Sequence, residues 1–145
     1  MLAEFLEPGK ILLNFEEHNY QEALRKMLSR SAEKNVDQVL DRILVRDKVM
    51  PTALDKGIFL PRAIMDEKPR SEVIMAINHG GLVFEDYGAS VANIIMLFLF
   101  SKSDDQAAIL AQSLRLLNDD GLRKTLFDCK KPDAVIKAIT EWEKQ

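Results

Sequence analysis

The sequence has little of what several classes of catalytic and metal-binding site require. One cysteine, Cys129, occurs among the 145 residues, so the chain cannot form an internal disulfide and gives no sign of an oxidising compartment. There are two histidines, His18 and His79, and neither lies in a catalytic triad or at metal-ligand spacing. The Gly80-Gly81 pair lacks the Gly-Lys-Ser sequence of a phosphate-binding loop. We therefore expect no metal and no cofactor, and these motifs alone indicate no enzyme.

An excess of positive charge and a long hydrophobic run are also missing. The net charge is -3, the pI is about 5.4 and no run of Lys and Arg exceeds two residues, which excludes broad binding to nucleic acid. The longest apolar stretch, residues 91–100, contains Asn93 and is far shorter than the ~20 residues of a transmembrane helix. Glu4 and Glu7 stand where a signal peptide carries positive charge. We expect a cytoplasmic protein that does not insert into a membrane.

The composition is that of a folded domain. With 47% hydrophobic and 30% charged residues, a chain of 145 residues suffices for one hydrophobic core. No repeat and no long linker divides the sequence. We therefore predict a single domain over residues 1–145.

Helices are predicted towards both ends of the chain. Three pairs of polar residues have the spacing of a helix start ahead of apolar residues at helical spacing: Asn19 with Glu22, Asn35 with Gln38, and Ser103 with Gln106. Residues 122–127 predict a short helix. Pro132 suits the first position of a final helix, whose apolar stripe ends at Trp142 and should pack on the sheet or on a neighbouring helix.

Short apolar runs bounded by glycine and proline fill the middle of the chain and are typical of strands. These runs are residues 11–15, 58–60, 73–77, 82–84 and 91–100. The last run is apolar at consecutive positions, which predicts a central strand covered on both faces. Helices, then strands, then helices imply an α/β fold in which a mixed sheet is flanked by helices on both faces.

The segment from Arg46 to Arg62 resembles a known motif. It is similar to the centre of EIIA domains of the fructose/mannitol class of the bacterial sugar phosphotransferase system, a class that includes the nitrogen-regulatory IIA proteins. The positions that match without a gap are Arg46, Thr52, Gly57, Ile58 and Pro61. Residues 6–11, 88–99 and 110–117 are similar to other parts of these domains. The resemblance covers nearly the whole chain and implies an EIIA-like fold.

The same resemblance implies a site that has lost its chemistry. EIIA domains pass phosphate from a histidine-phosphorylated carrier to a histidine after the proline, and then to a sugar permease. That position is here Arg62, whose guanidinium stays protonated and cannot accept a phosphoryl group at neutral pH. The second histidine of the family falls at about Gln106. The Gly-Ile-Gly of the family falls at residues 53–55, so Asp55 places a carboxylate where phosphate would approach.

The resemblance therefore predicts a regulatory protein that docks onto a kinase, a transporter or another phosphotransferase-system component without carrying phosphate. The face around Arg62 would bind this partner, with Arg46, Thr52 and Gln106 as further binding residues. Each residue also has a plainer interpretation. Arg62 can be an exposed strand end paired with Asp55 or Asp66, Gln106 can be a capping partner of Ser103, and Arg46 and Thr52 can be scaffold.

Two other functions stay open at this point. Arg62 and Arg46 suit the oxygens of an anionic small molecule or nucleotide, which would make the protein a ligand sensor. Alternatively, the chain is still a phosphocarrier and uses a non-standard histidine, His79 or His18.

Overall fold

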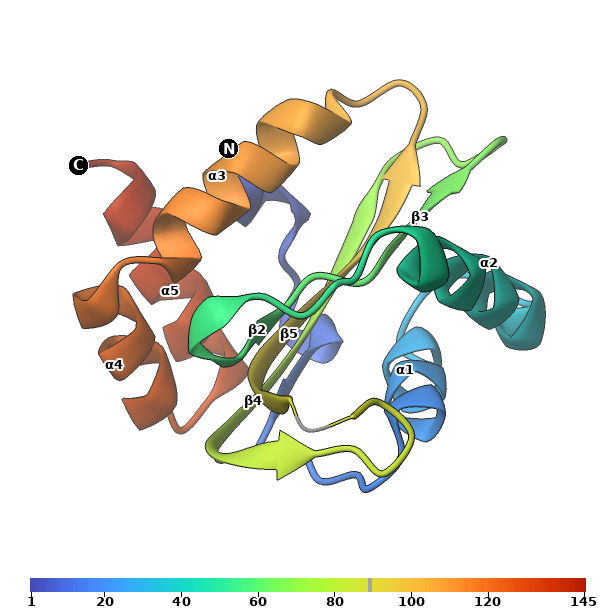
Figure 1. Ribbon diagram of the computed structural model, residues 1–145. Coiled ribbons are helices and arrows are strands. Elements are labelled where there is room, and N and C mark those ends of the chain that lie inside the picture. Colours follow the sequence, from blue (N-terminus) through green and yellow to red (C-terminus); the bar gives the residue numbers. More distant parts are fainter. Residues whose placement is uncertain (89) are drawn as a thin grey trace.

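A mixed five-stranded sheet forms the middle of the molecule in a computed structural model, which describes residues 1–88 and 90–145 (Figure 1). Its strands are β1 (Ile11–Leu13), β2 (Ile58–Phe59), β3 (Arg62–Met65), β4 (Glu72–Val83) and β5 (Val91–Ser101). The strand order is β1-β4-β5-β2, and β3 also pairs with β5. The long strands β4 and β5 are antiparallel, whereas the other pairs are parallel. β5 is thus the central strand that the apolar run predicts.

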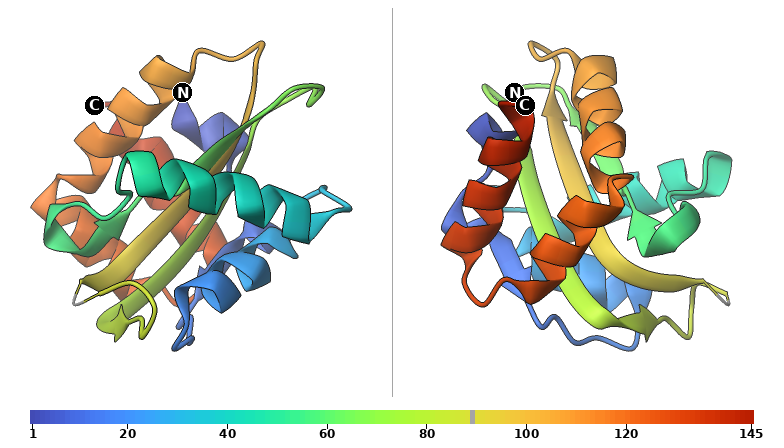
Figure 2. Two further views of the ribbon diagram at one scale, coloured as in Figure 1. Left: turned by 45° about the vertical axis from the view of Figure 1, so that its right-hand side comes forward. Right: turned by 90° about the vertical axis from the view of Figure 1, so that its left-hand side faces the viewer.

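Helices cover both faces of this sheet. They are α1 (Tyr20–Leu28), α2 (Val36–Val49), α3 (Gln106–Leu117), α4 (Asp120–Asp128) and α5 (Pro132–Glu143), with short 3-10 helices at Leu2–Phe5, Pro8–Lys10 and Asp55–Gly57. The views in Figures 1 and 2 place α1 and α2 on one face and α3, α4 and α5 on the other. The predicted three-layer α/β fold is confirmed. Within the residues described, every helix is too short or too polar to cross a membrane.

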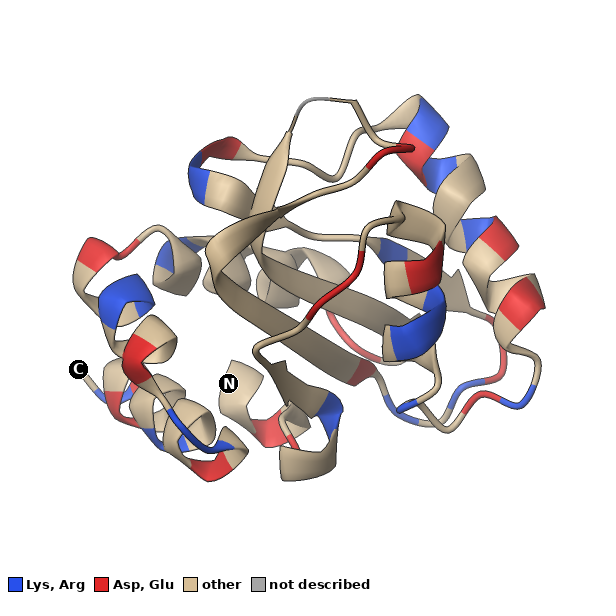
Figure 3. Cartoon of the chain, turned by 90° about the horizontal axis from the view of Figure 1, so that it is seen from below, with Lys and Arg blue, Asp and Glu red and all other residues tan. Residues whose placement is uncertain are grey.

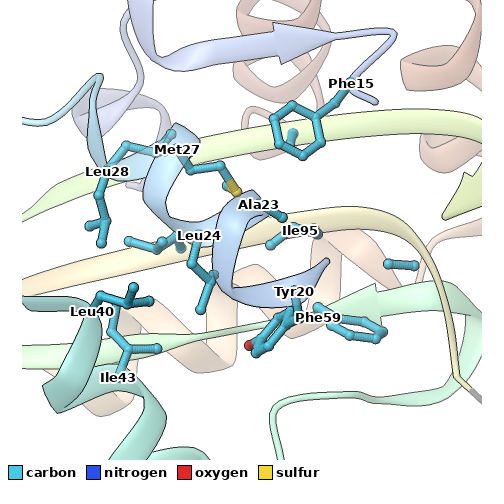
Figure 4. Packing of buried hydrophobic residues seen from close by; sticks show 14 of the residues in the cluster. Phe15, Tyr20, Ala23, Leu24, Met27, Leu28, Leu40, Ile43, Phe59 and Ile95 are labelled. Atoms are coloured by element: carbon cyan, nitrogen blue, oxygen red, sulfur yellow. The ribbon is translucent and has the colours of Figure 1, made fainter. Parts of the chain in front are cut away.

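Two hydrophobic clusters hold the layers together. Side chains of a strand alternate between faces, so the consecutive apolar residues of β5 serve both clusters. Ile95, Leu97 and Leu99 pack towards α1 and α2, while Ile94, Met96, Phe98 and Phe100 pack towards α3, α4 and α5. Figure 4 shows the first cluster, in which the apolar face of α1 and the ring of Tyr20 lie over the sheet beside Phe59.

Two of the three predicted helix starts are confirmed. The side chains of Asn19 and Asn35 accept hydrogen bonds from the backbone N–H groups three residues on, at 3.0 and 3.2 Å. The predicted start at Ser103 and Gln106 is wrong. The cap of α3 is Asp105, whose carboxylate accepts from the N–H of Ala108 at 3.0 Å, whereas the Ser103 hydroxyl lies 2.8 Å from that of Ser101. A carboxylate directly before the helix is the better acceptor, and Ser103 serves the turn after β5.

The two apolar runs predicted as separate strands, residues 73–77 and 82–84, belong largely to one strand. β4 continues from Glu72 to Val83, with a shift of register between Ile77 and Leu82. Gly81 has a φ of +87°, which is accessible to glycine and allows the bulge. The strand therefore bends instead of ending.

Candidate functional site

The chain between α2 and β3 folds back on itself at the edge of the sheet. The N–H of Leu60 donates to Thr52 O at 3.0 Å, and the N–H of Leu54 donates to Ile58 O at 2.8 Å. Gly57 lies in the turn with a φ of +73°, and a Cβ there would be 2.1 Å from the amide oxygen of Asn93. This close approach explains the glycine. The turn brings Arg62 back to the end of the helix that carries Arg46.

Thr52 lies inside this loop and is only 2% exposed. Its hydroxyl is 3.1 Å from the hydroxyl of Tyr20 and 3.3 Å from that of Tyr87. The Tyr20 hydroxyl in turn donates to Oδ2 of Asp47 at 2.9 Å. These contacts tie the loop to α1 and α2, so Thr52 holds the site in place and is covered from any partner.

Arg62 is half-buried at the start of β3 and is not the exposed strand end that the sequence suggests. Its Nη1 donates to Leu60 O at 3.0 Å, and its Nη2 donates to the sulfur of Met50 at 3.3 Å. The plainer interpretation allows a pair with Asp55 or Asp66, which is not found among the described residues: Asp66 pairs with Lys102 at 2.9 Å, and the Arg62 guanidinium turns towards the end of α2. The edge strand leaves that guanidinium next to a helix end instead of in free solvent.

The charges of Arg62, Arg46 and Asp47 act on one another. Burial lowers the pKa of Arg62, the charge of Arg46 lowers it further, and Asp47 opposes both effects. Burial raises the pKa of Asp47, although the Tyr20 hydroxyl and the two arginines favour its charged form. Among the described residues, Nε of both arginines and Oδ1 of Asp47 are buried without a hydrogen-bond partner. A carboxylate or phosphate oxygen would therefore have to bind through Nη of these arginines, because their Nε atoms are covered.

Asp47 and Tyr20 also lie at the candidate site, and sequence reasoning does not select them. A signal for Asp47 existed, because it directly follows Arg46, the first matching position of the motif that the sequence resembles. Tyr20 lies 32 positions before Thr52, and only the packing of α1 against the loop brings them together.

The other predicted site residues lie elsewhere. Gln106 is the first residue of α3, which covers the opposite face of the sheet from α2, and no hydrogen bond joins it to Arg62 in the described part of the chain. His79 is exposed at the bulge of β4, where its ring stacks on Phe127 of α4 with centroids 4.7 Å apart. His18 is exposed before α1. Across residues 1–88 and 90–145, no three His, Cys, Asp or Glu residues gather as a metal site.

The fold as a whole is that of the IIA proteins of the phosphotransferase system. The nitrogen regulatory protein IIA-Ntr from Neisseria meningitidis matches with a TM-score of 0.78 at 15% identity, over 95% of this chain and 98% of that one. IIA mannitol from Escherichia coli matches with a TM-score of 0.72 at 18% identity, over 92% and 98%. Enzyme IIA mannitol in its complex with phosphorylated enzyme IIB mannitol, also from Escherichia coli, matches with a TM-score of 0.73 at 17% identity, over 94% and 97%.

Likeness at such low identity establishes the fold alone. No relative is found among curated protein sequences. The family assignment comes from residues 4–142, which match the family model described as phosphoenolpyruvate-dependent sugar phosphotransferase system, EIIA 2, and the chain belongs to that family.

Proposed function

We propose that this protein is a regulatory member of the EIIA family that docks onto a protein partner through the face around Arg62 and carries no phosphate there. The partner would be a kinase, a transporter or another phosphotransferase-system component in the cytoplasm, with nitrogen regulation as one setting. The observation that carries the proposal is Arg62 itself. It takes the place that the family resemblance gives to the acceptor histidine, and it brings a fixed positive charge beside Arg46.

The arrangement around Arg62 supports docking. Hydrogen bonds to Leu60 O and the Met50 sulfur hold the guanidinium at the C-terminal end of α2. They use one N–H of Nη1 and one of Nη2, which leaves a second N–H on each, whereas Nε is buried. A partner carboxylate can accept a charge-assisted hydrogen bond from these remaining Nη donors. A relative of this fold, enzyme IIA mannitol from Escherichia coli, forms a complex with another protein, phosphorylated enzyme IIB.

The test is the substitution of Arg62 by alanine and by glutamate, followed by capture of partners from a native cytoplasm and measurement of affinity. Losing a charge-assisted contact worth ~1.5–3 kcal/mol weakens binding roughly ten- to a hundredfold. Arg115→Ala is the matched control, because Arg115 is exposed on α3, on the opposite face of the sheet. Unchanged affinity in both Arg62 variants would show that this residue is scaffold.

A second candidate function is the sensing of an anionic small molecule. The closeness of Arg46 and Arg62 favours it, because the charge of Arg46 lowers the pKa of Arg62 and two guanidinium groups can hold one oxyanion. Thermal-shift titration with inorganic phosphate and nucleotides separates the two functions. A rise in Tm that disappears in Arg62→Ala and in Arg46→Ala would support the sensor, while no rise with any anion would favour docking.

A further inference from the structure

Large apolar side chains are exposed on the outer face of α2 and at its C-cap, Met50. Val45 is 63% exposed, Val49 83% and Met50 53%. Val45 and Val49 are one helical turn apart and so lie next to each other on the helix surface. Arg42 and Arg46 have the same spacing. These five residues line a groove of about 270 Å³, and we call them the α2 stripe.

The α2 stripe is positively charged although the chain as a whole has a net charge of -3. Arg62 extends the stripe through its contact with Met50 at 3.3 Å. Figure 3 shows that the basic positions of α2 lie towards its C-terminal end, beyond the acidic positions of its first turns. Asp47, which stands between Arg46 and Lys48, accepts a hydrogen bond from Tyr20, and Asp41, next to Arg42, is exposed and contributes the opposite charge at the start of the stripe.

The local acids do little to neutralise this charge. Asp66 is the acidic partner of Arg42, and the closest N–O distance of that exposed pair is 4.0 Å. Exposed pairs of this kind contribute little. Nε of Arg46 and of Arg62 has no hydrogen-bond partner within the part of the chain described.

We propose that the α2 stripe binds an acidic amphipathic helix of a protein partner. This inference rests on the proposed docking function and names the chemistry of its partner. From Arg42 to Met50 the stripe is about 12 Å long, which matches about two turns of a second helix. Apolar side chains of that helix cover Val45, Val49 and Met50, and its carboxylates pair with Arg42, Arg46 and Arg62.

Charge argues against the other occupants. A second copy of this chain, docked stripe to stripe, would place the arginines of both copies against one another, and like charges across an interface cost affinity. An anionic membrane would attract the arginines, but interfacial helices insert a broad face with Trp, Phe or Leu, whereas this stripe offers two valines and a methionine. Of these three occupants, an acidic amphipathic helix is the one that matches both the charge and the shape of the α2 stripe.

The probe is a fluorescent, helix-forming peptide of about 18 residues with leucines at positions i, i+3, i+4 and i+7 and glutamates beside them. Anisotropy titration with the full chain is expected to show saturable binding that weakens as salt rises. Val49→Asp and Arg46→Ala should each reduce affinity about tenfold or more, since each removes one contact of the stripe. Amide shifts in an NMR titration should map to residues 42–50 and 62.

Val83→Asp is the matched control, because Val83 is 58% exposed on β4, away from the stripe, and its replacement should leave peptide affinity unchanged. Circular dichroism confirms that each variant is folded. The proposal is overturned if a peptide with lysines in place of glutamates binds equally well, or if Val49→Asp has no effect. The proposal is also overturned if the stripe binds vesicles of phosphatidylcholine and phosphatidylglycerol but no peptide, or if sedimentation analysis shows that the chain dimerises through the stripe.

The two proposals can fail separately. If Arg62→Ala abolishes capture of cytoplasmic partners while Val49→Asp does not, docking stands and the α2 stripe is not its surface. If neither variant changes capture, both proposals are wrong.

Discussion

The hydroxyl of Tyr20 offers a sharp test of how the site is held together. Tyr20 is 2% exposed, and its hydroxyl donates to Asp47 at 2.9 Å and lies 3.1 Å from Thr52. Tyr20→Phe keeps the ring packing against Phe59 but removes the donor. Because Oδ1 of Asp47 already lacks a partner among the described residues, the buried carboxylate would then depend on the Thr52 hydroxyl, the other hydroxyl that favours its charged form. We expect a loss of about 1–3 kcal/mol, a large share of the ~5–15 kcal/mol that stabilises a domain.

Asp47→Asn should behave in the opposite way. Burial raises the pKa of Asp47 above its ordinary value of 3.8, so the folded state binds this proton more tightly than the unfolded state. The stability linked to the proton is present below pH 3.8 and is lost as pH rises through the folded pKa, so at pH 7 the charge is a cost. Asparagine removes that charge and still accepts from Tyr20. We expect a change within about 1 kcal/mol of wild type, towards higher stability.

Urea unfolding at pH 7, followed by Trp142 fluorescence and circular dichroism, measures both effects. Tyr87→Phe is the control, because among the described residues the partners of the Tyr87 hydroxyl are the neutral N–H and hydroxyl of Thr52, each at 3.3 Å. This substitution should cost about 0.5–1.5 kcal/mol. In Tyr20→Phe/Asp47→Asn the loss should be smaller than in Tyr20→Phe alone, since no unpaired carboxylate is left. A Tyr20→Phe protein as stable as wild type, or an Asp47→Asn protein less stable than Tyr20→Phe, would refute this account of the loop.

Two further predictions concern the frame of the fold. Trp142→Ala should cost about 2–3 kcal/mol, which is less than for a fully buried Trp because Trp142 is half-buried. The loss includes the hydrogen bond that Nε1 of Trp142 donates to Asp119 at 3.0 Å. An unchanged Tm would show that α5 does not depend on this side chain. Glu72→Gln should cost about 2–3 kcal/mol in urea unfolding, since Lys10 and Lys68 lose the more buried of their two carboxylate partners and keep only Glu7 and Glu33. Burial raises the pKa of Glu72, but hydrogen bonds from the two lysines outweigh burial and lower the pKa below 4.5. The stabilisation by the Glu72 carboxylate is therefore present above pH 4.5 and is lost as the pH falls through the lowered pKa. A Glu72→Gln protein whose stability falls with acid as much as that of wild type would contradict this.

Much of the fold could be predicted because its signals are local. The caps at Asn19 and Asn35 need only residues three positions apart, and the consecutive apolar residues of β5 already indicate burial on both faces. The sequence predictions were wrong where two local arrangements were both compatible with the residue pattern. Asp105 displaces Ser103 as the cap of α3, and Gly81 lets one strand bend where the pattern indicates two.

The candidate site was harder to predict because its contacts are distant in sequence. The family motif places Arg62 near Arg46, and both residues do act on Asp47. The direction of the Arg62 side chain depends on Met50 and Leu60, which only the folded loop brings into reach. The exposure of Val45 and Val49 could not be predicted from the sequence either, because an apolar residue on a helix does not indicate which face of the helix stays exposed.

Phosphate transfer from the labelled histidine-phosphocarrier protein tests the central claim most directly. A histidine-bearing EIIA domain of the same family serves as the positive control. Because Arg62 cannot accept a phosphoryl group, we predict no label on this chain under conditions that label the control. Acid-labile, base-stable label on the wild-type protein would contradict the account. Its loss in His79→Asn would identify the exposed histidine beside Phe127 as the acceptor.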